Sequence, residues 1–146
     1  MTKLEKLKSV FIKDDNMRLF EEHADREELV GGIYLPNINE KLVVIIRLPE
    51  ENINNNIIVM LARLQPSKLK SALYLANQFN NKSNGPCLIV EEGNTRMDDI
   101  FMLYRYTYAL PIEDFNADIF NAILLGLLKE IDEGDLIKEV KRLQWS

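Results

Sequence analysis

Hydrophobic residues change their spacing several times along the chain, and each change marks a different kind of element. Near the N-terminus, four apolar residues from Leu4 to Phe11 recur at the spacing of one helix face, which predicts a helix over residues 2–13. The following residues, 14–28, fit either an extension of that helix or a short strand, and the pattern leaves both open. From residue 29 the period falls to two and β-branched residues dominate, which is typical of strands.

Five strands are predicted, and short turns join most of them. The first three form a meander, with a Gly31–Gly32 pair in the first strand that we expect to form a bulge. A Gly93–Asn94 pair predicts a tight turn between the last two strands. The predicted strands cover residues 29–35, 41–48, 57–64, 87–91 and 97–110.

A second helix is predicted to open at Pro66, because proline is favoured at the first position of a helix. Its end is marked by a polar segment that runs from Asn80 to Pro86. The inward stripe of this helix is expected to consist of Leu69, Leu73, Ala76 and Phe79.

A third helix is predicted after Pro111 and runs to about Glu133, with acidic residues in its first turn at positions 113 and 114. Gly134 can cap it, and a short extra helix is expected at about residues 135–144. The predicted order is α-β-β-β-α-β-β-α, with consecutive strands joined by turns. We therefore expect a single α+β domain over residues 1–146, in which helices pack on an antiparallel sheet.

The third helix carries too many apolar side chains for one buried face. Between Phe115 and Leu128 they spread over more than about 200° of the circumference, twice the stripe that a surface helix needs. The excess needs a cover, either a second subunit or the segment after Gly134, and the pattern leaves both open. Gly126 would suit a close crossing by another element. The protein-interface candidates are Phe120, Leu124, Leu127 and Leu128.

Charge and composition narrow the classes of partner. The net charge is −5, and residues 14–28 hold seven acids and two bases, so that this strip alone accounts for −5. No cluster of lysine and arginine marks a nucleic-acid surface. The single cysteine and the absence of an apolar leader in the first residues predict a cytoplasmic location, and the apolar runs are too short to span a membrane.

Residues that could carry chemistry are few. Cys87 and His23 are the candidates for a nucleophile and a base, but no third group with a recognisable motif supports them, and Cys87 is expected to act as a small buried hydrophobe. Two such ligands are too few for a structural zinc site. Tyrosines at 104, 106 and 108 alternate along one strand and are expected to line a core or an interface. No catalytic residue, cofactor or metal is predicted.

The segment LYLANQFNN at residues 73–81 is followed by a strand, a turn, a second strand and a helix that begins IEDFNADIF. In this order and in the Asn-x-Phe-Asn piece around Phe79, the chain resembles the YbjN-like family of candidate bacterial sensory transduction regulators. That family is similar in fold to the type III secretion chaperones. The resemblance implies a module that dimerises or binds protein and is not an enzyme, and residues 135–146 depart from the family pattern.

Two functions follow as expectations. The first is a non-enzymatic protein-binding module, chaperone-like or regulatory, that forms a homodimer and contacts neither nucleic acid nor membrane. The alternative is a small-ligand-responsive domain, or an enzyme without a recognisable motif, with a pocket on the sheet near Arg105 and Tyr106, to which Arg63 would contribute.

Overall fold

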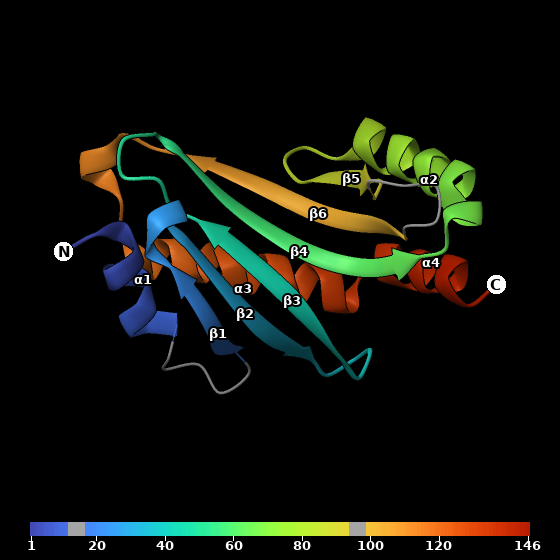
Figure 1. Cartoon of the computed structure of the whole chain (residues 1–146), viewed down its shortest axis with the longest axis horizontal. Coiled ribbons are helices and arrows are strands. Elements are labelled where there is room, and N and C mark those ends of the chain that lie inside the picture. The colour runs from blue at the N-terminus through green and yellow to red at the C-terminus, as the bar shows by residue number, and fades with distance from the viewer. Residues whose placement is uncertain (12–16, 94–98) are drawn as a thin grey trace.

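A six-stranded antiparallel sheet with strand order β1-β2-β3-β4-β6-β5 organises the structure, a computed structural model that describes residues 1–11, 17–93 and 99–146 (Figure 1). The helices pack against it, so the predicted α+β class with an antiparallel sheet is confirmed. The helices are α1 (Lys3–Phe11), α2 (Leu69–Lys82), α3 (Ala117–Glu133) and α4 (Asp135–Trp145), and the strands are β1 (Met17–His23), β2 (Glu28–Leu35), β3 (Glu40–Arg47), β4 (Asn54–Leu64), β5 (Cys87–Glu91) and β6 (Ile100–Ala109).

For residues 14–28 the sequence pattern did not decide between helix and strand. In the structure this segment contains strand β1, which pairs antiparallel with β2 at the edge of the sheet. Met17 is buried while the next residue, Arg18, is exposed, as the alternation of a half-buried strand requires. An ion pair of 2.6 Å between Lys8 and Glu22 connects β1 to α1. The element order therefore contains one strand more than the predicted order.

The glycine pair in β2 does not form the expected bulge. The register between β2 and β3 runs without a break through Gly31 and Gly32. The irregularity lies instead in β1, where the pairing shifts between Leu19 and Glu21 opposite Gly31. The bulge thus occurs one strand away from the prediction. The predicted tight turn between β5 and β6 includes Asn94, which lies outside the described residues.

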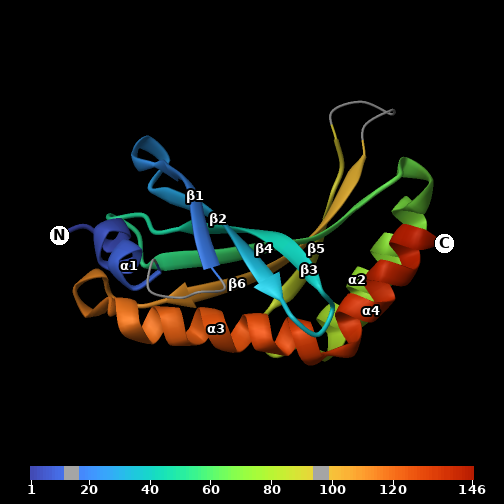
Figure 2. The same ribbon diagram turned by 90° about the horizontal axis from the view of Figure 1, so that it is seen from below.

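All four helices lie on one side of the sheet, and Figure 2 shows α3 running along that side. Alternate residues of β2, β3, β4 and β6 point toward the helices and are buried there, as the period of two predicts. The core that they form with the helices is continuous. Its largest fully buried side chains are Leu7, Leu29, Ile33, Ile46, Leu48, Ile57, Leu61, Leu88, Met102, Phe120 and Leu124.

The corner between α3 and α4 is fixed to the turn between β2 and β3. Both carboxylate oxygens of Asp132, near the end of α3, accept hydrogen bonds of 3.2 Å, one from the backbone N–H of Asn37 and one from that of Ile38. Lys141 in α4 forms an ion pair with Glu40 at the start of β3. Gly134 therefore lies at the junction of α3 and α4, where the sequence predicted the end of the third helix and the start of a short extra one.

Helix α1 is anchored by a lysine at its first residue. Lys3 is only 3% exposed, and its Nζ donates to the backbone oxygens of Pro49 and Asn52 and to Oδ1 of Asn55 at 2.8–3.1 Å. Burial lowers the pKa of Lys3, while the negative charges of Glu50 and Glu27 oppose that shift. These contacts connect the N-terminus of the chain to the loop between β3 and β4.

Two helices begin and pack differently from the predictions. A 3₁₀ turn over Pro66–Lys68 precedes α2, whose buried residues are Ala72, Leu75 and Ala76, whereas Leu73, assigned to the inward stripe, is 46% exposed. Helix α3 begins only at Ala117, because Oδ1 of Asn116 accepts a hydrogen bond of 3.1 Å from the backbone N–H of Ile119 and so caps the helix. The acids at 113 and 114 lie in the 3₁₀ turn before it.

Candidate functional site

The side of the sheet that faces away from the helices forms an exposed surface, which we call the open face. Among the described residues no helix covers it (Figure 2). Its central residues alternate in sequence with core residues, but they are not among the side chains that pack on the core. We call these central residues the apolar band: Val30, Val43, Ile45, Ile58, Met60, Ile89 and Leu103.

The strand register brings the apolar band together across the sheet. Val43 lies opposite Met60, and Met60 lies opposite Leu103, which in turn pairs with Ile89 on the edge strand β5. In a second row of the apolar band, Val30 lies opposite Ile45, and Ile45 lies opposite Ile58. Neighbouring strands lie about 4.8 Å apart, so five strands carry the band across about 20 Å. Of its seven members, Ile58 is buried, at 8% exposure, and the others are half-buried.

Charged side chains of both signs surround the apolar band. Nε of Arg47 donates to Glu28 at 2.9 Å on one side, and Nε of Arg63 donates to Asp99 at 2.5 Å on the other. The Arg63 guanidinium also lies 5.8 Å from the centre of the Phe101 ring. By their strand register, further charges on this face are Arg18, Glu21, Lys41, Glu91 and Arg105.

The four predicted interface residues on α3 lie in the core of the chain itself. Phe120 and Leu124 are fully buried, and Leu127 and Leu128 are at most 7% exposed. The cover comes from α1, α4 and the sheet, which pack around α3. These side chains are therefore not available to a second subunit in this structure, and the interface assignment on α3 is corrected.

Two large apolar side chains of α3 are exposed. Ile119 is 52% exposed and Leu125 is 38% exposed. A Cβ placed on Gly126 would meet no atom within 4 Å, so the close crossing expected at this glycine does not occur in the described part of the chain.

The alternative ligand site near Arg105 and Tyr106 is divided by the sheet. Arg105 is exposed on the open face, whereas Tyr106 packs against the core on the helix side, because neighbouring residues of a strand point in opposite directions. Tyr104 and Tyr108 also face the helices, so the tyrosines line the core as expected. Arg63 lies on the open face with Arg105. These arginines and tyrosines do not line a common pocket.

The two candidate catalytic groups lie on opposite edges of the sheet. His23 ends β1, where its Nε2 lies 2.5 Å from Oε2 of Glu21, and Cys87 begins β5. Strands β1 and β5 are the two edge strands. Cys87 is half-buried on the open face rather than buried in the core. A nucleophile and base pair cannot form from residues so far apart.

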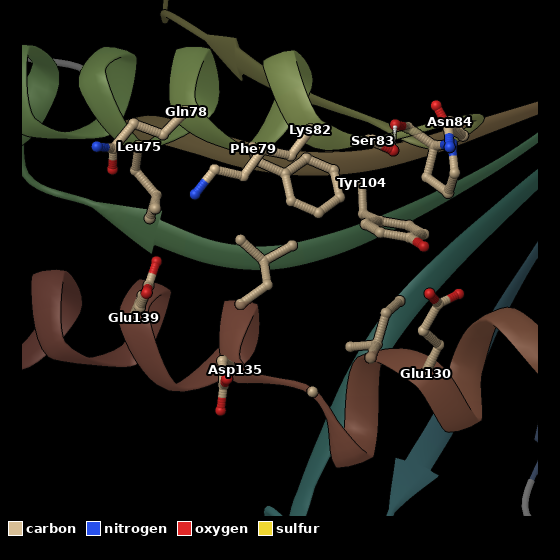
Figure 3. A pocket seen from close by; sticks show the side chains of 14 residues that line it. Leu75, Gln78, Phe79, Lys82, Ser83, Asn84, Tyr104, Glu130, Asp135 and Glu139 are labelled. Atoms are coloured by element: carbon tan, nitrogen blue, oxygen red, sulfur yellow. Dashed lines mark hydrogen bonds between the residues drawn. The ribbon is translucent and has the colours of Figure 1, made fainter.

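A pocket of about 730 Å³ lies on the helix side, between α2 and the α3–α4 corner (Figure 3). Its apolar lining includes Phe79 and Tyr104, whose ring centres are 6.1 Å apart, and Ile131 and Leu136. Polar residues from α2, the segment after it, α3 and α4 complete its wall: Gln78, Lys82, Ser83, Asn84, Glu130, Asp135 and Glu139.

Tyr104 stands out among the pocket residues because its side chain is almost wholly buried, at 3% exposure. Burial raises the pKa of its hydroxyl well above the ordinary value, and the negative charge of Glu130 raises it further. The phenol therefore stays neutral under physiological conditions. The sequence singled out Tyr104 only as one of three tyrosines in a stripe, and no local signal indicated that α2 and α3 would meet around it.

Neither a metal-binding cluster nor a membrane-spanning helix is found among the described residues. Within residues 1–11, 17–93 and 99–146, no three histidine, cysteine or acidic side chains cluster closely enough to hold a metal ion. In the same residues, none of the helices is both long and apolar enough to cross a bilayer.

Comparisons with known proteins bear on the fold. No protein-family model matches the chain, and a search of curated proteins gave no significant match. Among solved structures, the chain is similar to the crystal structure of YbjN from E. coli, a candidate transcription regulator, with a TM-score of 0.67 and 16% sequence identity. The similarity covers 95% of this chain and 91% of YbjN. The resemblance inferred from the sequence is thereby supported, and the chain has a YbjN-like fold.

Proposed function

We propose that this chain is a non-enzymatic regulatory module that binds protein through the open face of its sheet, and that the protein bound there is a second copy of the chain. The observation that carries the proposal is the apolar band, whose members other than Ile58 are half-buried on a sheet whose other side already holds the core. Burial of apolar surface contributes about 25 cal/mol per Å². An uncovered sheet face with such a band is therefore a favourable docking surface.

A homodimer fits the charges around the band. In a two-fold interface the same patch must complement itself, so it needs both signs of charge. The open face meets this condition, because basic residues such as Arg47 and Arg63 alternate with acidic ones such as Glu28 and Asp99. Two copies can pack face to face as in a sandwich, with the sheets about 10 Å apart.

Two observations support a regulatory rather than an enzymatic role. The YbjN structure that shares this fold belongs to a candidate transcription regulator. His23 and Cys87 lie on opposite edge strands and cannot cooperate in catalysis.

The single cysteine supports the cytoplasm as the location of the module, since the chain can form no internal disulfide.

Sedimentation velocity at micromolar concentration tests the proposal. We expect the wild type to sediment as a dimer and Met60→Lys, which places a charge in the centre of the band, to sediment as a monomer with an unchanged circular dichroism spectrum. Leu125→Lys is the control, since Leu125 is also apolar and accessible, at 38% exposure, but lies on α3. A monomeric wild type, or a Met60→Lys variant that remains dimeric, would contradict the proposal.

A further inference from the structure

We propose that the pocket between α2 and the α3–α4 corner binds a small organic amine in its ammonium form, with an alkyl or aromatic body. The pocket volume of about 730 Å³ lies within the range of small-molecule sites, which hold about 300–1,000 Å³. The pocket is on the helix side of the sheet, opposite the open face. The inference is thus independent of the proposed dimer.

The floor of the pocket suits the body of such a ligand. The rings of Phe79 and Tyr104 are tilted by 51° with their centres 6.1 Å apart, and Leu136 and Ile131 continue the apolar surface. Aromatic faces attract cations through their quadrupole, in addition to packing against alkyl or aryl groups. The floor therefore accommodates both the apolar body and a neighbouring positive charge.

The hydroxyl of Tyr104 gives the pocket a polar group next to its aromatic floor. Tyr104 is 3% exposed and lines the pocket, and its hydroxyl oxygen is not among the fully buried atoms of the described residues that lack a hydrogen-bond partner. An ammonium group can donate an N–H to the phenol oxygen, and this phenol stays neutral because burial and then Glu130 raise its pKa.

The charges of the pocket determine which ligand it favours. In Figure 3 the carboxylates of Glu130 and Glu139 point into the gap between α2 and the α3–α4 corner, whereas that of Asp135 points away from it. Lys82, from α2, is the one basic residue among those that line the pocket. The carboxylates outnumber this base, so an ammonium group is attracted to the gap and an anionic ligand is repelled.

The pocket continues along α2 and α4, which leaves room for the ligand body. An adjoining depression of about 480 Å³ shares Leu75, Gln78 and Glu139 with it and is extended by Tyr74 and Leu143. The side chains of Leu75 and Leu143 line this part as apolar surface. A ligand whose charged end lies beside Glu130 can therefore place an apolar chain in this direction.

Titrations with three probes of similar size test the proposal, with binding followed by nuclear magnetic resonance chemical shifts up to millimolar concentration. The probes are phenethylammonium, the neutral phenethyl alcohol and the anionic 3-phenylpropionate. We expect saturable binding of the amine and at least about tenfold weaker binding of the other two, because each charge-assisted hydrogen bond contributes about that factor.

Two matched variants locate the site. Glu130→Gln should weaken amine binding by about tenfold, whereas Glu133→Gln, an exposed acid on the same helix outside the pocket, should leave binding unchanged. Equal affinity for the three probes, unchanged binding in Glu130→Gln, or no saturable binding of the amine would each overturn the proposal.

Discussion

The side chain of Asn80 pairs with the backbone of Leu88 as a neighbouring strand would. Its Oδ1 accepts from the N–H of Leu88 at 2.7 Å, and its Nδ2 donates to the carbonyl oxygen of Leu88 at 2.9 Å. Leu88 lies in the edge strand β5, whose outer backbone groups have no further strand beside them. Asn80 therefore connects the end of α2 to the sheet edge and satisfies both groups at once.

Replacing Asn80 should cost stability. Asn80→Ala removes both hydrogen bonds, and we expect the free energy of unfolding to fall by about 1–2 kcal/mol, the value for paired groups that remain near solvent. Urea denaturation followed by circular dichroism measures the change. The exposed neighbour Asn81 provides the control, and a loss in Asn81→Ala as large as that in Asn80→Ala would count against the role of the paired bonds.

The two kinds of apolar residue on α3 should respond differently to truncation. Leu124 is fully buried, so Leu124→Ala should lower the free energy of unfolding by about 2–5 kcal/mol through lost packing and the cavity left behind. Ile119 is 52% exposed, so Ile119→Ala should change it by less than about 1 kcal/mol. Denaturant titrations of both variants compare the two, and similar losses would contradict the burial described for α3.

Replacing each of two glycines near α3 by alanine should change the free energy of unfolding in opposite directions. Gly126 has open space where a Cβ would lie, so Gly126→Ala should raise the free energy of unfolding by about 0.5–1 kcal/mol through helix propensity. At Gly134 a Cβ would lie 2.7 Å from the backbone oxygen of Glu130, so Gly134→Ala should lower it by about 1–3 kcal/mol. Thermal unfolding of both variants shows the sign directly. A stabilised Gly134→Ala protein would mean that the corner can shift without cost.

Stability at alkaline pH should report on Tyr104. Its pKa is raised in the folded protein, by burial and then by Glu130, so the unfolded chain loses the tyrosine proton first as the pH rises. Deprotonation then favours unfolding, and the wild type should lose stability relative to Tyr104→Phe above about pH 10, by up to about 1.4 kcal/mol per pH unit. Below that pH the difference between the two proteins should stay constant.

Unfolding in urea between pH 8 and pH 11 measures this difference. Tyr74, which is 66% exposed, provides the matched control, and Tyr74→Phe should keep the wild-type pH profile. A pH profile that is parallel for the wild type and Tyr104→Phe would show that Tyr104 is not held neutral in the folded state.

Much of the fold could be predicted because its signals are local. The β-branched run in KLVVIIRL and the helical spacing around Leu124 indicated the elements and the α+β class that the structure confirms. Segment 17–23 could not be assigned, because a single edge strand with charged residues has a weak pattern and becomes a strand by pairing with β2. Its partner strand, β2, lies on the other side of a turn, and hydrophobic periodicity within one segment does not indicate such a pairing.

The candidate sites depended on contacts that no local pattern contains. The width of the apolar surface on α3 correctly indicated that more than one element covers it, and the structure shows that α1, α4 and the sheet provide the cover. The strands, in contrast, are apolar on both faces around Val43 and Val44, so their alternation could not indicate which face the helices would leave exposed. The meeting of Phe79, Tyr104 and Glu130 around one pocket likewise requires α2 and α3, which are distant in sequence, to lie on the same side of the sheet.

The sequence by itself therefore determined most of the elements, the fold class and the need to cover the third helix, since backbone propensity and hydrophobic period act over a few residues. Only the tertiary structure decided that the chain itself buries Phe120, Leu124, Leu127 and Leu128 of this helix and leaves the apolar band on a face that no described helix covers. The physical reason is that burial depends on which distant segments pack together, and in the described part of the chain the helices lie on one side of the six-stranded sheet and none covers its other side.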